Sequence, residues 1–162
     1  MRFSLVDRIT SLEAGRRVTA VKNLSLAEEY LADHFPGFPV MPGVLMLESL
    51  VQASAWLLRY TSDFRHSTIL LKEAKAVRFN SFVTPGRTLE VTATIQEPGD
   101  RETVLKGSGT VDGVTAVSAK LTLEQFNLSE RGEMWQASDR DRIERMRSLF
   151  NEIWSPAAAT SS

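Results

Sequence analysis

Residues 43–60 read GVLMLESLVQASAWLLRY, a run with apolar side chains on nearly every face of a helix. Pro42 stands just before it, where the first turn of a helix tolerates proline because its missing N–H costs no hydrogen bond. A helix of this composition should be buried on most sides rather than lie on a surface. At 1.5 Å per residue it is about 25 Å long. The sequence therefore predicts one long buried helix around which the rest of the domain folds.

Strand patterns flank this helix on both sides. We expect a short strand within residues 3–12 and a second over 16–24, where Val18, Ala20 and Lys22 share one face. Four more candidate strands follow the helix, separated by Pro-Gly or Asp-Gly turns: residues 67–80, 87–96, 102–111 and 114–126. The longest would span about 45 Å. A strand so much longer than the helix predicts an α+β domain in which a strongly curved antiparallel sheet wraps around it, the hotdog fold.

Two further helices are expected. Ser25 and Glu28 form a capping-box pattern that predicts a short helix over residues 26–32. Within residues 134–154, apolar residues recur at helical spacing among charged ones, which predicts an appended amphipathic helix: Ile143, Met146, Phe150, Ile153 and Trp154. We therefore divide the chain into a hotdog domain (1–126), a helical extension (127–154) and a disordered tail (155–162).

Composition excludes several classes of protein. The net charge of -1 gives no reason to expect nucleic acid as a partner. The chain has no cysteine, so thiolate metal sites and a cysteine nucleophile are excluded. Charged residues interrupt the N-terminus too early for a secretory signal, and no apolar run approaches the roughly 20 residues of a membrane span. We expect a soluble cytoplasmic protein.

His34 and Glu48 are the candidate catalytic residues. His34 opens a loop that three prolines and two glycines, ending at Gly43, make stiff. Such a loop can hold an imidazole, the side chain best suited to moving protons near neutral pH. Glu48 lies inside the apolar helix, where a carboxylate is costly unless it is paired, neutral or used. The free N–H groups of Gly43 and Val44 at the helix start could polarise a carbonyl oxygen.

A base, an acid and a carbonyl polariser suit removal of water from a 3-hydroxyacyl thioester. Each residue also has a simpler interpretation when it is considered alone. A histidine beside a loop is more often a surface or capping residue, and a glutamate in an apolar helix can face a gap in the packing. His66 has no companion in the sequence, and we assign it no role. The occurrence of His34, Gly43 and Glu48 within one short stretch favours a catalytic role over these simpler interpretations.

Residues 34–48, HFPGFPVMPGVLMLE, followed by Gln52-Ala53, resemble the signature of the 3-hydroxyacyl-acyl carrier protein dehydratases of fatty-acid synthesis. The similarity extends to LVDR at residues 5–8, AVKN at 20–23 and VTPG at 83–86, and covers roughly residues 3–124. A glutamate at position 48 resembles the dehydratase-only branch of this family. Phe82 and Arg87 depart from its usual pattern, and residues 127–154 go beyond its usual end.

This resemblance implies a hotdog fold and a catalytic pair, His34 and Glu48. It also implies that the Gly43 amide holds the thioester carbonyl, and we place Val44, Phe35 and Gln52 with it as substrate-binding residues. We expect no cofactor and no metal. The implied partner is an acyl carrier protein bearing the substrate. Two chains should pair through a continuous sheet, in some members as a trimer of dimers, with the histidine and the acid of one site on different chains.

Two other functions compete with dehydration. A hotdog acyl thioesterase would use a carboxylate on the central helix, but without the loop that His34 opens. A non-catalytic acyl-binding or dimerisation module would keep the fold and often lose His34 or Glu48. Both residues are present, which favours the dehydratase. The sequence leaves open the acyl chain length and whether coenzyme A replaces the carrier protein.

Overall fold

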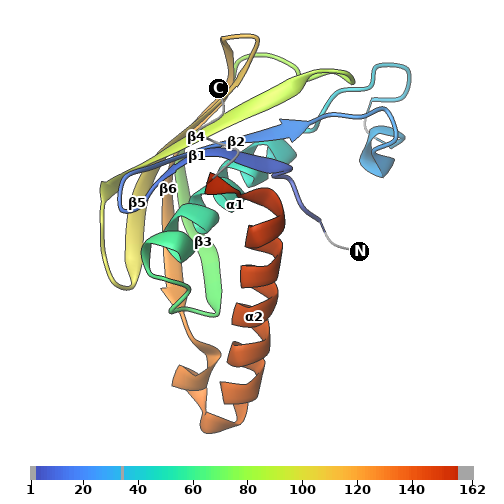
Figure 1. Ribbon diagram of the computed structural model, residues 1–162. Helices are drawn as coiled ribbons and strands as arrows, with labels where there is room; N and C mark the ends of the chain where they lie inside the picture. Colours follow the sequence, from blue (N-terminus) through green and yellow to red (C-terminus); the bar gives the residue numbers. More distant parts are fainter. Residues whose placement is uncertain (1–2, 34, 157–162) are drawn as a thin grey trace.

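The computed structural model describes residues 3–33 and 35–156 (Figure 1). Within this part of the chain, six strands form one antiparallel sheet in the order β1-β2-β4-β5-β6-β3. The strands are β1 (Arg8–Glu13), β2 (Arg17–Asn23), β3 (Thr68–Phe79), β4 (Thr88–Glu97), β5 (Glu102–Val111) and β6 (Val114–Phe126). The helices are α1 (Gly43–Thr61) and α2 (Gln136–Ile153), with single 3₁₀ turns η1 (Glu29–Leu31), η2 (Leu128–Arg131) and η3 (Glu133–Trp135).

Helix α1 is the centre of the domain, as the sequence predicted. Figure 1 shows the sheet curving around it, and α1 contacts every strand. Leu50 and Leu57 are completely buried, and eight more of its residues are buried with them: Met46, Ser49, Val51, Ala53, Ser54, Ala55, Trp56 and Leu58. The hotdog fold predicted from the sequence is confirmed. Among the described residues, no helix is long and apolar enough to cross a membrane.

The predicted strands are also confirmed, with small shifts at their ends. β5 and β6 have the expected bounds, and the others end within a residue or two of theirs, except that β1 begins only at Arg8. Val18, Ala20 and Lys22 form the buried face of β2, as the alternation indicated. The buried Lys22 ammonium lies 2.8 Å from Glu28 and 3.8 Å from Asp7. Two carboxylates thus compensate its burial.

The helix predicted over residues 26–32 is wrong. Only the single turn η1 forms there, because Glu28 has an extended backbone (φ -64°, ψ 122°) that interrupts a helix. The capping-box side chains are used in other ways. The Ser25 hydroxyl accepts a hydrogen bond from Ala27 N–H at 3.1 Å, and the Glu28 carboxylate binds Lys22. An ion pair with β2 therefore replaces the helix cap that the sequence pattern predicted.

Helix α2 docks on the domain and runs beside α1 (Figure 1). The Phe150 ring is buried against three aromatic rings, with centroid distances of 5.9 Å to Trp56, 5.7 Å to Tyr60 and 5.4 Å to Phe64. Arg147 donates to Asp63 and covers the Phe64 ring at 4.7 Å. The amphipathic stripe predicted from the sequence thus packs against the domain, with Phe150 and Ile153 buried and its other members, Ile143, Met146 and Trp154, partly buried.

A buried carboxylate fixes the start of α2. Asp139 accepts hydrogen bonds from the N–H groups of Leu128 and Ser129, both at 2.9 Å, and from the Ser67 hydroxyl. Burial by itself would raise the pKa of Asp139, but these hydrogen bonds outweigh it and lower the pKa to about 2. The stability from this junction is therefore present at neutral pH and is lost only as the pH falls toward 2.

The boundary at residue 126 stays a prediction. So does the disordered tail, of which residues 157–162 lie outside the described residues.

Replacing Phe150 by alanine should destabilise the fold by about 3–5 kcal/mol, the usual cost of removing a buried phenylalanine ring. The ring belongs to α2 and packs against Trp56 and Tyr60 of α1 and against Phe64, so its loss leaves a cavity between the two helices. Thermal unfolding followed by circular dichroism measures the effect. Met134→Ala is the matched control, because Met134 is 82% exposed and its loss should leave the melting temperature unchanged. Equal melting temperatures for both variants would contradict this role of α2.

Candidate active site

Burial anchors the loop that leads into α1. Val40 and Met41 are buried completely, and Met41 N–H donates to the carbonyl oxygen of Val83 at 2.9 Å. This hydrogen bond ties the loop to the segment between β3 and β4. His34, the predicted catalytic base, lies outside the described residues. Its role in the site stays a prediction.

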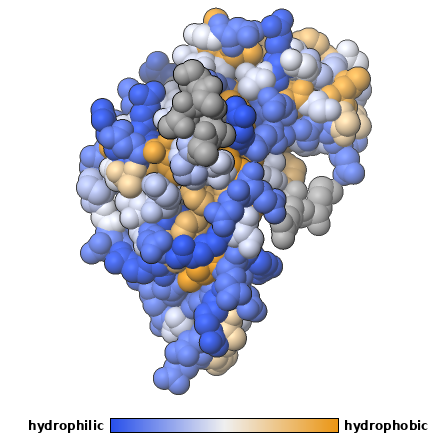
Figure 2. Space-filling model, in the orientation of Figure 1, coloured by the Kyte–Doolittle hydropathy of each residue, from blue (hydrophilic) through white to orange (hydrophobic). Residues whose placement is uncertain are grey.

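Aromatic side chains crowd the surface of this loop. Phe35 and Phe38 are about half exposed, and the Phe38 ring meets the Phe82 ring edge-on at 5.6 Å. Phe38 N–H closes a turn by donating to Phe35 O at 2.9 Å, and Gly37 within this turn has a φ of 85° that favours glycine. Figure 2 shows apolar surface at this end of the molecule (upper right). The loop therefore presents an apolar face around the position where the sequence predicts the base.

At the start of α1, the N–H groups of Gly43 and Val44 have no hydrogen-bond acceptor among the described residues, and their predicted role stays a prediction. Leu45 N–H donates the first helical hydrogen bond, to Pro42 O at 2.9 Å, so Gly43 and Val44 precede the helical ladder. Gly43 lies against the Phe79 ring, and a Cβ at this position would be only 3.1 Å from the ring. Glycine is therefore the residue that lets Phe79 approach the helix start.

Glu48 is held by a neighbouring amide. The Gln52 amide nitrogen donates to Glu48 Oε1 at 3.2 Å and to Phe3 O at 3.0 Å, and its oxygen accepts from Leu5 N–H at 2.8 Å. Glu48 itself is half-buried. Gln52 therefore ties the N-terminal segment to α1 and orients the carboxylate. Its predicted contact with substrate stays a prediction.

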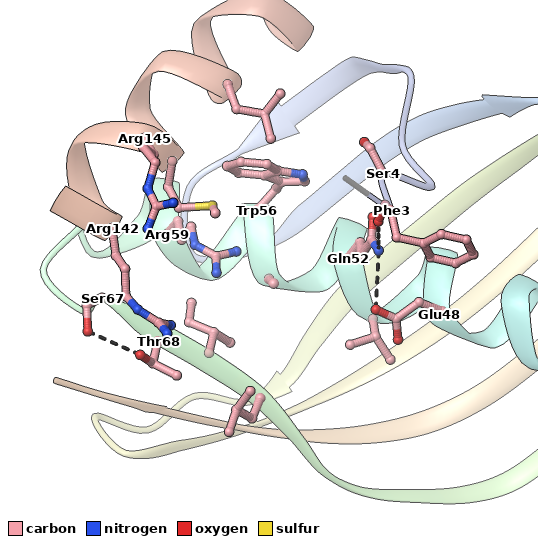
Figure 3. A pocket seen from close by; sticks show the side chains of 16 residues that line it. Phe3, Ser4, Glu48, Gln52, Trp56, Arg59, Ser67, Thr68, Arg142 and Arg145 are labelled. Carbon is pink, nitrogen blue, oxygen red and sulfur yellow. Dashed lines mark hydrogen bonds between the residues drawn. The ribbon is translucent and has the colours of Figure 1, made fainter. Parts of the chain in front are cut away.

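A groove of about 550 Å³ begins at Glu48 and follows one side of α1 (Figure 3). The helix contributes residues at steps of three and four, which is the spacing of a single face: Glu48, Val51, Gln52, Ala55, Trp56 and Arg59. The N-terminal segment, residues 67–70 and helix α2 complete the walls. The lining is apolar in its middle part and polar at both ends. Gly43, Val44 and Phe35 are not among the described residues that line it.

A second cavity of about 420 Å³ lies on the other side of Phe3 and Ser4, which line both spaces. Tyr30 and Asp33 line this second cavity. The Tyr30 hydroxyl is buried with no hydrogen-bond partner among the described residues. Burial, together with the charges of Glu28 and Asp7, raises the pKa of Tyr30 to about 12, so the hydroxyl remains a donor. Tyr30 and Asp33, the residue before position 34 in the chain, therefore line the same cavity.

The structure thus brings Glu48 and Gln52 together and leaves Gly43 and Val44 at the start of the same helix. Sequence reasoning overlooked Tyr30 and Arg59. Arg59 had a usable signal, because it is a charged residue in an apolar helix, as Glu48 is. The two residues are eleven positions apart, which is about three helical turns and predicts one common face. For Tyr30 the sequence carried no signal, since its burial depends on the fold.

Comparison with known proteins identifies the family of the chain. Residues 1–120 match the model of the FabA-like domain. The 3-hydroxyacyl-acyl-carrier-protein dehydratase FabZ of Latilactobacillus sakei subsp. sakei is 41% identical over 118 residues, which cover 73% of this chain and 84% of that one. FabZ of Oenococcus oeni is 40% identical over 117 residues, 72% of this chain and 84% of that one.

Solved structures support the fold at lower identity. The dehydratase heterocomplex ApeI:P from Xenorhabdus doucetiae matches with a TM-score of 0.66 and 19% identity, over 82% of this chain and 90% of that one. The smu.793 protein of Streptococcus mutans, solved with acetyl CoA, matches with a TM-score of 0.58 and 15% identity, over 77% and 92%. The family-model match and the two FabZ relatives, which agree over most of the domain, show that this chain belongs to the FabA-like domain family.

Proposed function

We propose that this chain removes water from 3-hydroxyacyl thioesters carried on acyl carrier protein, which yields trans-2-enoyl thioesters for fatty-acid synthesis. The observation that carries the proposal is the Glu48 carboxylate, half-buried at the end of the groove and oriented by Gln52. The names of the two FabZ relatives support the reaction and the carrier. A groove with an apolar middle suits an acyl chain.

The proposed reaction needs three groups. His34 takes the proton from the carbon next to the thioester carbonyl, and the electrons of that C–H bond form the new double bond. The bond from the third carbon to its hydroxyl breaks, and Glu48 gives that oxygen a proton so that it leaves as water. The N–H of Gly43 at the positive end of α1 stabilises negative charge on the thioester oxygen. Val44, Phe35 and Gln52 complete the proposed binding surface.

The working unit in this proposal is a homodimer built through β3. This strand pairs only with β6 and forms one edge of the sheet. In a monomer, its exposed apolar residues would make this edge strand prone to aggregation: Leu70, Leu71 and Phe79. A second copy that adds its own β3 would pair the free backbone groups and cover these side chains. The trimer of dimers and the cytoplasmic location stay predictions from the sequence.

We expect His34→Ala and Glu48→Gln each to lower turnover by about 10²–10⁴-fold, because each removes a proton-transfer group. Hydration of a crotonyl thioester, followed by the loss of ultraviolet absorbance, measures the reverse reaction. His66→Ala and Glu152→Gln are matched controls from outside the proposed site, and both should stay active. A His34 or Glu48 variant that keeps more than about a tenth of wild-type turnover would overturn the assigned roles.

Mixing the two inactive variants tests the dimer. If His34 and Glu48 of one site come from different chains, a mixed dimer of His34→Ala and Glu48→Gln chains contains one intact site. About a quarter of the wild-type activity should then return, provided that subunits exchange at random and that the sites act independently. Subunit exchange is verified with differently tagged chains and native mass spectrometry. Verified exchange without any recovery of activity would mean that each site is built within one chain.

A further inference from the structure

Three arginines gather at the end of the groove that lies opposite Glu48. Arg59 comes from α1, and Arg142 and Arg145 come from α2. Figure 3 shows these arginines at one end of the groove, beside Ser67 and Thr68, with Glu48 and Gln52 at the other. Eleven residues of helix separate Glu48 from Arg59, which corresponds to about 16 Å.

These arginines have no acidic partner within the described residues. The ion pairs found there include none of the three, and Glu48 is the only carboxylate among the described residues that line the groove. The Nε of Arg59 is buried and makes no hydrogen bond with any of them. Arg147 on the same helix differs, since it pairs with Asp63. Arg142 and Arg145 are exposed and Arg59 is half-buried, so all three charges can reach an anion that enters this end of the groove.

Arg59 is the most constrained of the three. Its guanidinium lies over the Trp56 ring, 5.2 Å from the centroid, which fixes its direction along the groove. Burial lowers the pKa of Arg59 to about 10, so it remains charged at neutral pH while being poorly hydrated. A weakly hydrated, unpaired guanidinium is a strong binder of carboxylate or phosphate.

Between its charged ends the groove is apolar. Val51, Ala55 and Trp56 of α1 face Ile69 of β3 and Leu149 of α2. A hydrocarbon chain would remove this surface from water, whereas a pantetheine arm would bury two amide groups there without partners. The lining therefore selects a ligand that is apolar in the middle and anionic at its far end.

We propose that Arg59, Arg142 and Arg145 form a subsite for a carboxylate at the far end of the acyl chain. This inference rests on the proposed function, which places the reacting thioester near Glu48. The preferred substrate is then a 3-hydroxyacyl thioester whose chain ends in a carboxylate rather than in a methyl group. Two of the three arginines lie beyond residue 120, where the FabA-like match ends. The added helix α2 is thus the source of this selectivity.

The test compares two enoyl thioesters of equal length on N-acetylcysteamine, a carrier without phosphate. One chain ends in a methyl group and the other in a carboxylate, and kcat/KM for hydration is measured for each. The wild type should prefer the carboxylate-ended chain. In Arg142→Gln/Arg145→Gln this preference should fall by about 10- to 100-fold, the value of hydrogen bonds to a charged group. Arg140→Gln, an exposed arginine on the same helix that does not line the groove, should leave the ratio unchanged.

Two outcomes would overturn the proposal. One is a wild-type enzyme with no preference, or a double variant that keeps the wild-type ratio. The other comes from a repeat of the assay with the same two enoyl chains on coenzyme A, whose pantetheine arm carries phosphate. It is a double variant that loses kcat/KM on both coenzyme A thioesters but on neither N-acetylcysteamine thioester. In that case the arginines bind the carrier's phosphate.

A binding measurement separates this proposal from the proposed function. Octanoate and the uncharged octanol are titrated into the full chain by calorimetry. Octanoate should bind more tightly, and the double variant should bind it at least about tenfold more weakly. This result without turnover of any thioester would support the anion subsite and overturn the dehydratase function. Turnover of thioesters without this difference in binding would support the dehydratase function and overturn the anion subsite.

Discussion

The burial of α1 is the constraint from which the rest of the structure follows. A helix with ten buried residues needs cover on most of its circumference, and a curved sheet supplies it with few gaps. The larger polar side chains of the buried part of the helix, Glu48, Gln52 and Arg59, lie along the strip that the sheet leaves open. The groove occupies this strip. Its position is therefore set by the packing of the core as well as by chemistry.

Helix α2 closes part of the same strip. Its Phe150 covers the aromatic end of α1, and Asp139 fixes its start by accepting hydrogen bonds from two backbone N–H groups and a hydroxyl. The hydrophobic stripe that docks the helix also holds two arginines, Arg142 and Arg145, beside the groove. One amphipathic helix thus stabilises the fold and gives the groove its charged end. Loss of its packing should disturb both.

Much of this fold could be predicted because its signals are local. The length and apolarity of α1 predicted a central helix, and the Asp112-Gly113 turn set the bounds of β5 and β6. The failure at residues 26–32 came from a contact with the sheet, since Glu28 pairs with Lys22 of β2 instead of capping a helix. The same limit applies to the site. Glu48 could be singled out from its neighbours in the sequence, but the Phe3 carbonyl that holds its partner Gln52 is brought there only by folding.

The roles proposed for Glu48 and Arg59 depend on the regular geometry of the α-helix, which can be applied to the sequence directly. Eleven residues are close to about three turns, so the two side chains share a face, and the rigid backbone keeps them about 16 Å apart. In the arrangement that we propose, this distance sets how far the carboxylate end of the acyl chain lies from the reacting carbon, so the spacing on α1 determines the acyl chain length that fits. Moving the arginine by one turn would change the measured length by about 5.4 Å. Chain-length selection would then be set by the position of a charge on a buried helix, while Glu48 and the fold stay the same.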